Sequence, residues 1–143
     1  MSTAAFYRRV VDETGGTDRA LAERGTAAVL RALRDRLTPE EARQVAAQLP
    51  RALRETWDAG AEWGVRPVKL HRRELYERVK ADAALPSIRD ARAMVVAVFA
   101  ALKAQISPGE ADDVAAQLPA DLRELWAGAG AWADRDAQKR GGA

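Results

Sequence analysis

The sequence has no cysteine and only one histidine, His71, among its 143 residues. Without cysteine, disulfides, thiolate metal sites and cysteine nucleophiles are excluded. A single imidazole leaves little material for a histidine metal cluster or a pair of histidine acid–base groups. We also find no glycine-rich phosphate loop, nucleophile elbow or metal-spaced cluster. These absences favour a protein that is not an enzyme and needs no cofactor or metal.

Strong net charge and long hydrophobic runs are also missing. The 23 basic and 21 acidic residues give a net charge of +2, so neither half resembles a basic domain that binds a phosphate backbone. The longest apolar run, residues 93–102, is too short to span a membrane. The N-terminus lacks the apolar core of a signal peptide. We therefore expect a cytoplasmic protein that does not contact membranes.

The chain is rich in alanine and contains an internal repeat. Counting the sequence gives 32 Ala, and 19 of the 23 basic residues are Arg. Residues 28–63 recur as residues 97–132, at an offset of 69 without a gap, and 18 of the 36 aligned positions are identical. Because the matches include Trp, Pro and Gln as well as Ala, duplication explains them better than low complexity.

Apolar spacing in each copy predicts four helices. Leu30, Leu33 and Leu37, for example, follow the spacing of one helical face, and Phe99, Leu102 and Ile106 repeat it. We predict an all-α fold of about eight helices, built as two tandem four-helix repeats that pack into a compact helical bundle. The copies would be related by an approximate two-fold or by stacking. The predicted segments are a first repeat (1–66), a basic linker (67–73), a second repeat (74–133) and a flexible tail (134–143).

The clearest local signal is the start of the third helix in each copy. Thr38 and Ser107 stand where an N-cap hydroxyl is expected, each followed by Pro, with Glu41 and Glu110 three residues on. In a capping box, the hydroxyl accepts the N3 amide and the Glu side chain returns to the N-cap amide. The neighbouring acids, in the pairs 40–41 and 112–113, are explained by the helix dipole.

The repeated string resembles the bacterial family catalogued as domain of unknown function 2267. Gln-Leu-Pro at 48–50 and 117–119, followed by Arg54 or Arg123 and then by Trp57 or Trp126, carries this resemblance. Because the string occurs twice, the resemblance covers nearly the whole chain as two tandem copies. It implies a small, helical, cytoplasmic bacterial protein, and it supplies no catalytic or ligand residues to transfer.

Four residues are candidates for binding a partner: Trp63, Trp132, Arg54 and Arg123. Each Trp lies six residues after a Trp expected in the core, which is about 240° around a helix, so the two rings share a face only if the helix breaks. Gly60, Gly128 and Gly130 could supply that break. The second Trp would then cap the core, join the copies or enter a partner.

The two arginines have two interpretations. Arg54 and Arg123 could grip an anion in a pocket between the copies. The alternative, which we favour, is that they pair with Glu41 or Glu110 or with carbonyl groups at the end of a neighbouring helix. Gln48 and Gln117 are similarly expected to satisfy polar groups at helix ends.

The densest basic run lies in the linker, at Arg66, Lys69, Arg72 and Arg73, beside His71. It could contact nucleic acid or another anion. Arg73 and Glu77 are, however, a favourable helical pair, so a solvated face is the simpler interpretation.

Taken as a whole, the sequence favours a non-enzymatic helical interaction or adaptor protein that binds another protein, or itself, through a surface built by the repeat. The alternative is a nucleic-acid or anion-binding regulatory protein that uses the arginine-rich linker face. A third possibility is a small ligand held between the copies.

Overall fold

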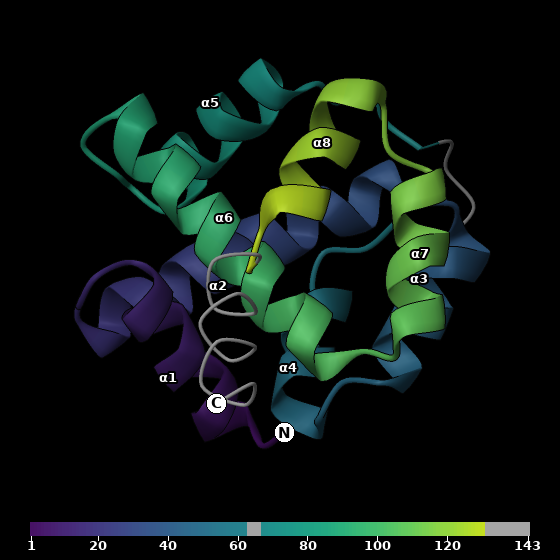
Figure 1. Ribbon diagram of the computed structural model, residues 1–143, viewed down its shortest axis with the longest axis horizontal. Coiled ribbons are helices and arrows are strands. Elements are labelled where there is room, and N and C mark those ends of the chain that lie inside the picture. Colours follow the sequence, from purple (N-terminus) through teal and green to yellow (C-terminus); the bar gives the residue numbers. More distant parts are fainter. Residues whose placement is uncertain (63–66, 131–143) are drawn as a thin grey trace, which may run out of the picture.

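The computed structural model describes residues 1–62 and 67–130, which fold into eight helices (Figure 1). The helices are α1 (Thr3–Glu13), α2 (Arg19–Arg36), α3 (Pro39–Ala47), α4 (Arg51–Asp58), α5 (Arg72–Asp82), α6 (Ile88–Gln105), α7 (Pro108–Ala116) and α8 (Ala120–Gly128). We call residues 1–62 the first half and residues 67–130 the second half. The predicted all-α bundle of about eight helices is confirmed. Each helix of the second half begins 69 residues after a helix of the first.

Side-chain caps start most of these helices. Ser2, Asp18 and Ser87 accept the N3 amides of α1, α2 and α6. Thr38 and Ser107 do the same for α3 and α7, where Pro occupies the first turn. α5 begins at Arg72, so two residues of the predicted linker already belong to its first turn.

Residues in the left-handed backbone region follow several helix ends. Gly15 (φ 84°) and Gly16 (φ 110°) follow α1, and at the position matching Gly15 the second half has Ala84, with φ 53°. Gly60 (φ 75°) and Gly130 (φ 79°) follow α4 and α8. The expected break after the first Trp of each copy is therefore confirmed at Gly60 and Gly130, while Gly128 is the last residue of α8.

The two longest helices, α2 and α6, pack against each other in the core. They carry most of the buried aliphatic side chains, including Leu30, Leu33 and Leu102. The close approach depends on Gly25 of α2, because a Cβ atom at this position would overlap the Met94 side chain of α6. Gly25 and Met94 are 69 residues apart, so matching positions of the two halves meet at this contact.

The first helix of each half packs across the other half. α1 makes its most extensive contacts with α6, and α5 packs against α2 as well as α6 (Figure 1). Phe6 and Val10 of α1 are fully buried, as is Val79 of α5. The two halves therefore share one interlocked core.

The short helices close the opposite side of the bundle, where α3 packs on both α4 and α7. Trp57 of α4 is fully buried, and its indole nitrogen donates to the Ala42 carbonyl of α3 at 3.0 Å. Trp126 of α8 donates to the Ala111 carbonyl of α7 at 3.2 Å. Both tryptophans predicted for the core are confirmed there. Of the described helices, none combines the length and apolar character needed to cross a membrane.

Candidate functional site

Reciprocal hydrogen bonds join the two halves where α3 and α7 begin. Gln117 Oε1 accepts the Thr38 amide at 2.9 Å, and its Nε2 donates to Thr38 Oγ1 at 3.2 Å. Gln48 Oε1 accepts the Ser107 amide at 2.7 Å, and its Nε2 donates to Ser107 Oγ at 3.5 Å. Each Gln thus satisfies helix-end groups, as predicted, but it does so on the helix of the other half.

This arrangement corrects the predicted capping box. The hydroxyl part is confirmed, because Thr38 and Ser107 accept the amides of Glu41 and Glu110. The return contact from Glu to the N-cap amide is wrong, since that amide is already donated to a Gln side chain of the other half. The Glu side chains are therefore available to point into the contact between α3 and α7.

Glu41 and Glu110 lie close together at this contact. They are 69 residues apart, and only 8% of Glu41 and 5% of Glu110 is exposed. A buried oxygen of each, Glu41 Oε2 and Glu110 Oε1, has no hydrogen-bond partner among the neutral and basic groups of residues 1–62 and 67–130. Two ionised carboxylates are costly in such a place, because burial and like charge both oppose ionisation.

Burial, a hydrogen bond with Glu41 and the negative charges of Glu41 and Asp113 together raise the pKa of Glu110 from 4.5 to about 7, and burial has the largest effect. The pair can therefore hold one shared proton near neutral pH. Ligand oxygens of Glu41, Glu110 and Asp113 lie within 4.8 Å of one another. Carboxylates at this spacing could also hold a hard divalent cation, which would compete with the proton.

A second polar feature lies where α4 and α8 end. Arg34 Nη1 donates to the carbonyls of Trp57 and Ala59, at 2.8 and 2.6 Å. Lys103, at the matching position of the second half, donates through Nζ to the carbonyls of Trp126 and Ala129, at 2.7 and 3.0 Å. A cation thus satisfies the carbonyl groups at the C-terminal end of each helix.

In the first half, Arg34 also binds a carboxylate. Asp35 Oδ1 lies 2.8 Å from Arg34 Nη2, and Asp35 Oδ2 lies 2.6 Å from Arg78 Nη2 of α5. Only 5% of the Arg34 side chain is exposed. Asp35 therefore bridges a buried cation and a partly exposed one, and in doing so it ties α2 to α5.

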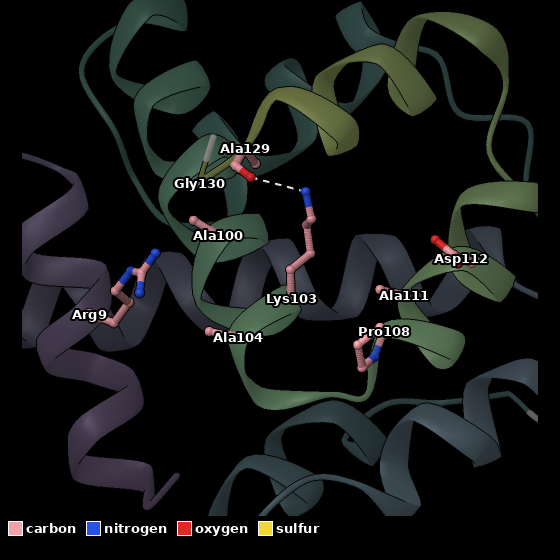
Figure 2. A pocket seen from close by; sticks show the side chains of 9 residues that line it. All are labelled: Arg9, Ala100, Lys103, Ala104, Pro108, Ala111, Asp112, Ala129 and Gly130. Carbon is pink, nitrogen blue, oxygen red and sulfur yellow. Dashed lines mark hydrogen bonds between the residues drawn. The ribbon is translucent and has the colours of Figure 1, made fainter. Parts of the chain in front are cut away.

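In the second half the matching region is an open pocket of about 370 Å³ (Figure 2). Its lining includes Arg9, Ala100, Lys103, Ala104 and Asp112. Arg9 and Lys103 match Arg78 and Arg34 in the aligned halves, and Ala104 stands where the first half has Asp35. Figure 2 shows Ala104 and Ala100 between the side chains of Arg9 and Lys103. We call this cavity the second-half pocket.

The predicted arginine candidates serve the short helices. Arg54 Nη2 donates to the Leu49 carbonyl at 3.3 Å, and Arg123 Nη2 donates to the Leu118 carbonyl at 3.0 Å. The favoured interpretation, a contact with carbonyls at a helix end, is confirmed for both residues. Each remains exposed at the surface, and neither lines the second-half pocket.

The basic residues predicted to bind an anion in the linker differ in their contacts. Lys69, Arg72 and Arg73 are exposed, and Arg73 pairs with Glu77 at 3.2 Å, as expected. The Arg72 amide donates to Asp121 Oδ2 at 2.9 Å. Arg66 lies outside the described residues, and so do both tryptophan candidates, Trp63 and Trp132.

The bond from Arg72 influences an acid on α8. Burial raises the pKa of Asp121, but hydrogen bonds from the Arg72 amide, His71 and the Leu122 amide outweigh it, and the pKa is below 3.8. His71 Nδ1 lies 3.4 Å from Asp121 Oδ1. These contacts give the exposed His71 a local role at the start of α5.

Sequence reasoning did not predict the acidic pair or the second-half pocket. A signal for the pair was present, because Glu41 and Glu110 occupy the same position in the aligned copies. The signal for the pocket was the replacement of Arg31 and Asp35 by Ala100 and Ala104 at matching positions. Neither signal could be used without knowing which positions face the other half.

Comparison with known proteins gives one match and one negative result. The family described as "Uncharacterized conserved protein (DUF2267)" matches residues 3–125 in a single span that includes both halves. No curated protein matches the chain. Because the match covers well over half of the sequence, the protein belongs to the DUF2267 family.

Proposed function

We propose that this chain is a non-enzymatic helical interaction protein that binds another protein, or a second copy of itself, through the face around the second-half pocket. One observation carries the proposal. The two halves have the same helices in the same order, yet Ala100 and Ala104, which line an open pocket beside α6, stand where α2 has Arg31 and Asp35. A difference confined to side chains on a shared scaffold is typical of a binding surface.

Several contacts support binding rather than catalysis. Polar side chains at matching positions of the two halves bind backbone groups at helix ends: the glutamines cap α3 and α7, and Arg34 and Lys103 cap α4 and α8. Four alanines, one proline and one glycine form much of the pocket lining, together with two cations and one acid. Such a surface offers shape and charge to a partner.

We also infer that the chain arose by tandem duplication of one four-helix unit, with an approximate two-fold axis between the copies. The reciprocal glutamine bonds support this inference, and so do the pairs of matching positions that meet, Gly25 with Met94 and Glu41 with Glu110. The unit would then be the ancestral half of the family sequence. We further propose that the protein is bacterial and lies in the cytoplasm.

Site-specific photo-cross-linking in cells that carry the native gene tests the proposed face. A benzoylphenylalanine at position 112 would stand at the pocket, and the same residue at position 43 is a matched control, because both positions are exposed on equivalent helices. We expect a discrete cross-linked product from position 112 alone. A product of twice the 15.5 kDa monomer mass identifies self-association. Equal products from both positions, or none from 112, contradict the proposal.

The alternative, a nucleic-acid or anion-binding regulatory protein, would use Arg66, Lys69, Arg72 and Arg73. It has less support, because Arg73 is paired with Glu77 and the backbone of Arg72 is bonded to Asp121. A salt titration of binding to mixed-sequence DNA and RNA tests it. Binding that weakens steeply with salt favours this alternative, and no binding at low salt eliminates it.

A further inference from the structure

Three carboxylates meet where α3 of the first half packs against α7 of the second (Figure 1). Glu41 belongs to α3, and Glu110 and Asp113 belong to α7. One oxygen of each side chain lies within 4.8 Å of an oxygen of the other two. Glu41 and Glu110 are more than nine-tenths buried, whereas Asp113 is exposed. The cluster is thus a buried acidic pair with a third acid that is in contact with solvent.

The two buried side chains each carry an oxygen that lacks a partner. Glu41 Oε2 and Glu110 Oε1 are shielded from water and receive no hydrogen bond from residues 1–62 and 67–130. The N-cap amides that such acids usually accept are donated to glutamines of the other half. Buried carboxylates in proteins are paired or bind metal ions. These two oxygens therefore indicate a group that is supplied from outside the chain.

Within the described part of the chain, no basic side chain pairs with the cluster. None of the ion pairs between residues of 1–62 and 67–130 includes Glu41, Glu110 or Asp113. Besides burial, the groups that shift the pKa of Glu110 are the two other acids of the cluster. A shared proton neutralises only one of the three acids, whereas a divalent cation would neutralise two.

We propose that Glu41, Glu110 and Asp113 bind a hard divalent cation, which joins α3 to α7 and thereby links the two halves of the chain. Carboxylate oxygens are the ligands that such cations prefer. The cation would enter from the solvent side, at Asp113, and water would complete its coordination. None of the three carboxylates lines the second-half pocket, so this site is independent of the proposed function.

The spacing of the carboxylates favours Ca²⁺ over Mg²⁺. Three atoms that all lie within 4.8 Å of one another share a centre at most about 2.8 Å from each, close to the Ca²⁺–oxygen distance of about 2.3–2.6 Å. Mg²⁺ requires about 2.1 Å in a strict octahedron and gives up its water reluctantly, which a buried pair demands. Because only three side chains contribute, we expect a Kd on the order of 10⁻⁴ M for Ca²⁺.

Isothermal titration calorimetry of the full-length protein tests the site directly. The protein is freed of metal with EDTA and dialysed at pH 8, and CaCl₂ and MgCl₂ are titrated separately, with NaCl keeping the ionic strength constant. We expect one Ca²⁺ per chain and weaker binding of Mg²⁺. E110Q and D113N should each weaken binding at least about tenfold. E40Q is the matched control, because it removes an exposed acid next to Glu41 and should leave binding unchanged.

Thermal denaturation gives a second measurement and also shows whether each variant folds. CaCl₂ at about 10 mM should raise the Tm of the natural chain by about 5 °C relative to NaCl of equal ionic strength, because the cation binds only when α3 and α7 are together. E40Q should show the same increase. E110Q and D113N should unfold cooperatively without this increase.

Mn²⁺ locates the site, because it binds the same kind of oxygen ligands and its unpaired electrons broaden nearby NMR signals. Substoichiometric Mn²⁺ should broaden the backbone amide signals of residues 40–44 and 109–114 first, and excess Ca²⁺ should restore them. Broadening centred on another part of the chain would place the cation elsewhere and overturn the proposed site.

The variants decide between a cation site and a pair that holds only a proton. Binding of Ca²⁺ or Mg²⁺ that E110Q and D113N weaken, and that E40Q does not, supports the site. No saturable binding of either cation overturns the inference and leaves the shared proton as the counter-charge of the pair. Equal weakening in E40Q would also overturn it, because binding would then reflect the general negative charge of the surface.

Discussion

The side-chain oxygen of Gln48 accepts the backbone amide of Ser107 at 2.7 Å, across 59 residues of sequence. The bond satisfies the amide of the N-cap residue directly before α7, a group that the helix cannot satisfy by itself. Gln117 makes the matching bond to Thr38. A residue near the end of one short helix thus caps the start of its counterpart in the other half.

Removing either glutamine side chain should destabilise the protein. We expect Q48A and Q117A each to lower the free energy of unfolding by about 1 kcal/mol, the usual size of a lost helix cap. Urea denaturation followed by circular dichroism gives the values. Q44A is the matched control, since Gln44 is an exposed glutamine of α3, the helix that ends directly before Gln48. A loss for Q48A no larger than for Q44A would show that the bond does not contribute.

The acidic pair makes stability depend on pH. Because the pKa of Glu110 is raised to about 7 in the fold, the folded protein binds more protons than the unfolded chain between about pH 4.5 and pH 7. Stability should therefore fall as pH rises through this window. The loss attributable to the pair is on the order of 3 kcal/mol at pH 8.

A neutral side chain at position 110 should remove this dependence. We expect E110Q and the natural chain to be equally stable near pH 5, because Gln can donate to Glu41 as a protonated Glu does. At pH 8 we expect E110Q to be the more stable of the two. E40Q is the control, since Glu40 is exposed beside the pair. Urea denaturation between pH 5 and 8 with EDTA present keeps divalent cations off the carboxylates. Parallel profiles for E110Q and the natural chain would refute the shared proton.

The contact between Gly25 and Met94 predicts the effect of exchanging these two residues. G25M places two long side chains where one fits, and overpacking should cost about 3 kcal/mol. The double variant G25M/M94G should recover most of that loss, since matching positions meet and either side can supply the bulk. Thermal denaturation of the single and double variants measures the recovery. A double variant as unstable as the sum of its single changes would argue against the exchange.

Ala84 should be improved by glycine. Its φ of 53° lies in the left-handed region, where a Cβ atom costs about 1 kcal/mol, and the matching residue of the first half is Gly15. We expect A84G to raise the free energy of unfolding by about 0.5 kcal/mol, since glycine's greater freedom in the unfolded chain offsets part of the relief. Reciprocally, G15A should be destabilising. If A84G instead lowers the free energy of unfolding and G15A raises it, backbone strain is not decisive at this turn.

Local patterns were sufficient for the helices and poor for contacts between the halves. Leu30, Leu33 and Leu37 lie in the core because their spacing is that of one helical face, and that spacing depends on local sequence alone. The capping box was half right for the same reason. Thr38 caps its own helix, but the partner of its amide comes from Gln117, 79 residues away. No local pattern contains that information.

The candidate sites were harder to predict, because they arise from packing. Glu41 and Glu110 look like ordinary first-turn acids until α3 is placed against α7. Similarly, Ala104 is a common residue in an alanine-rich helix. It becomes informative only beside the first half, where Asp35 joins Arg34 to Arg78.

The packing of α1 on α6 and of α5 on α2 has a consequence for how such a protein could originate. A lone unit would leave its long helix uncovered, so its folding would require a second molecule and would depend on concentration. Fusing two units removes that dependence, because the partner is always tethered. Fusion also frees the copies to diverge. Identical subunits cannot place Gly opposite Met, or carry an acid on one side only, whereas one continuous chain can do both.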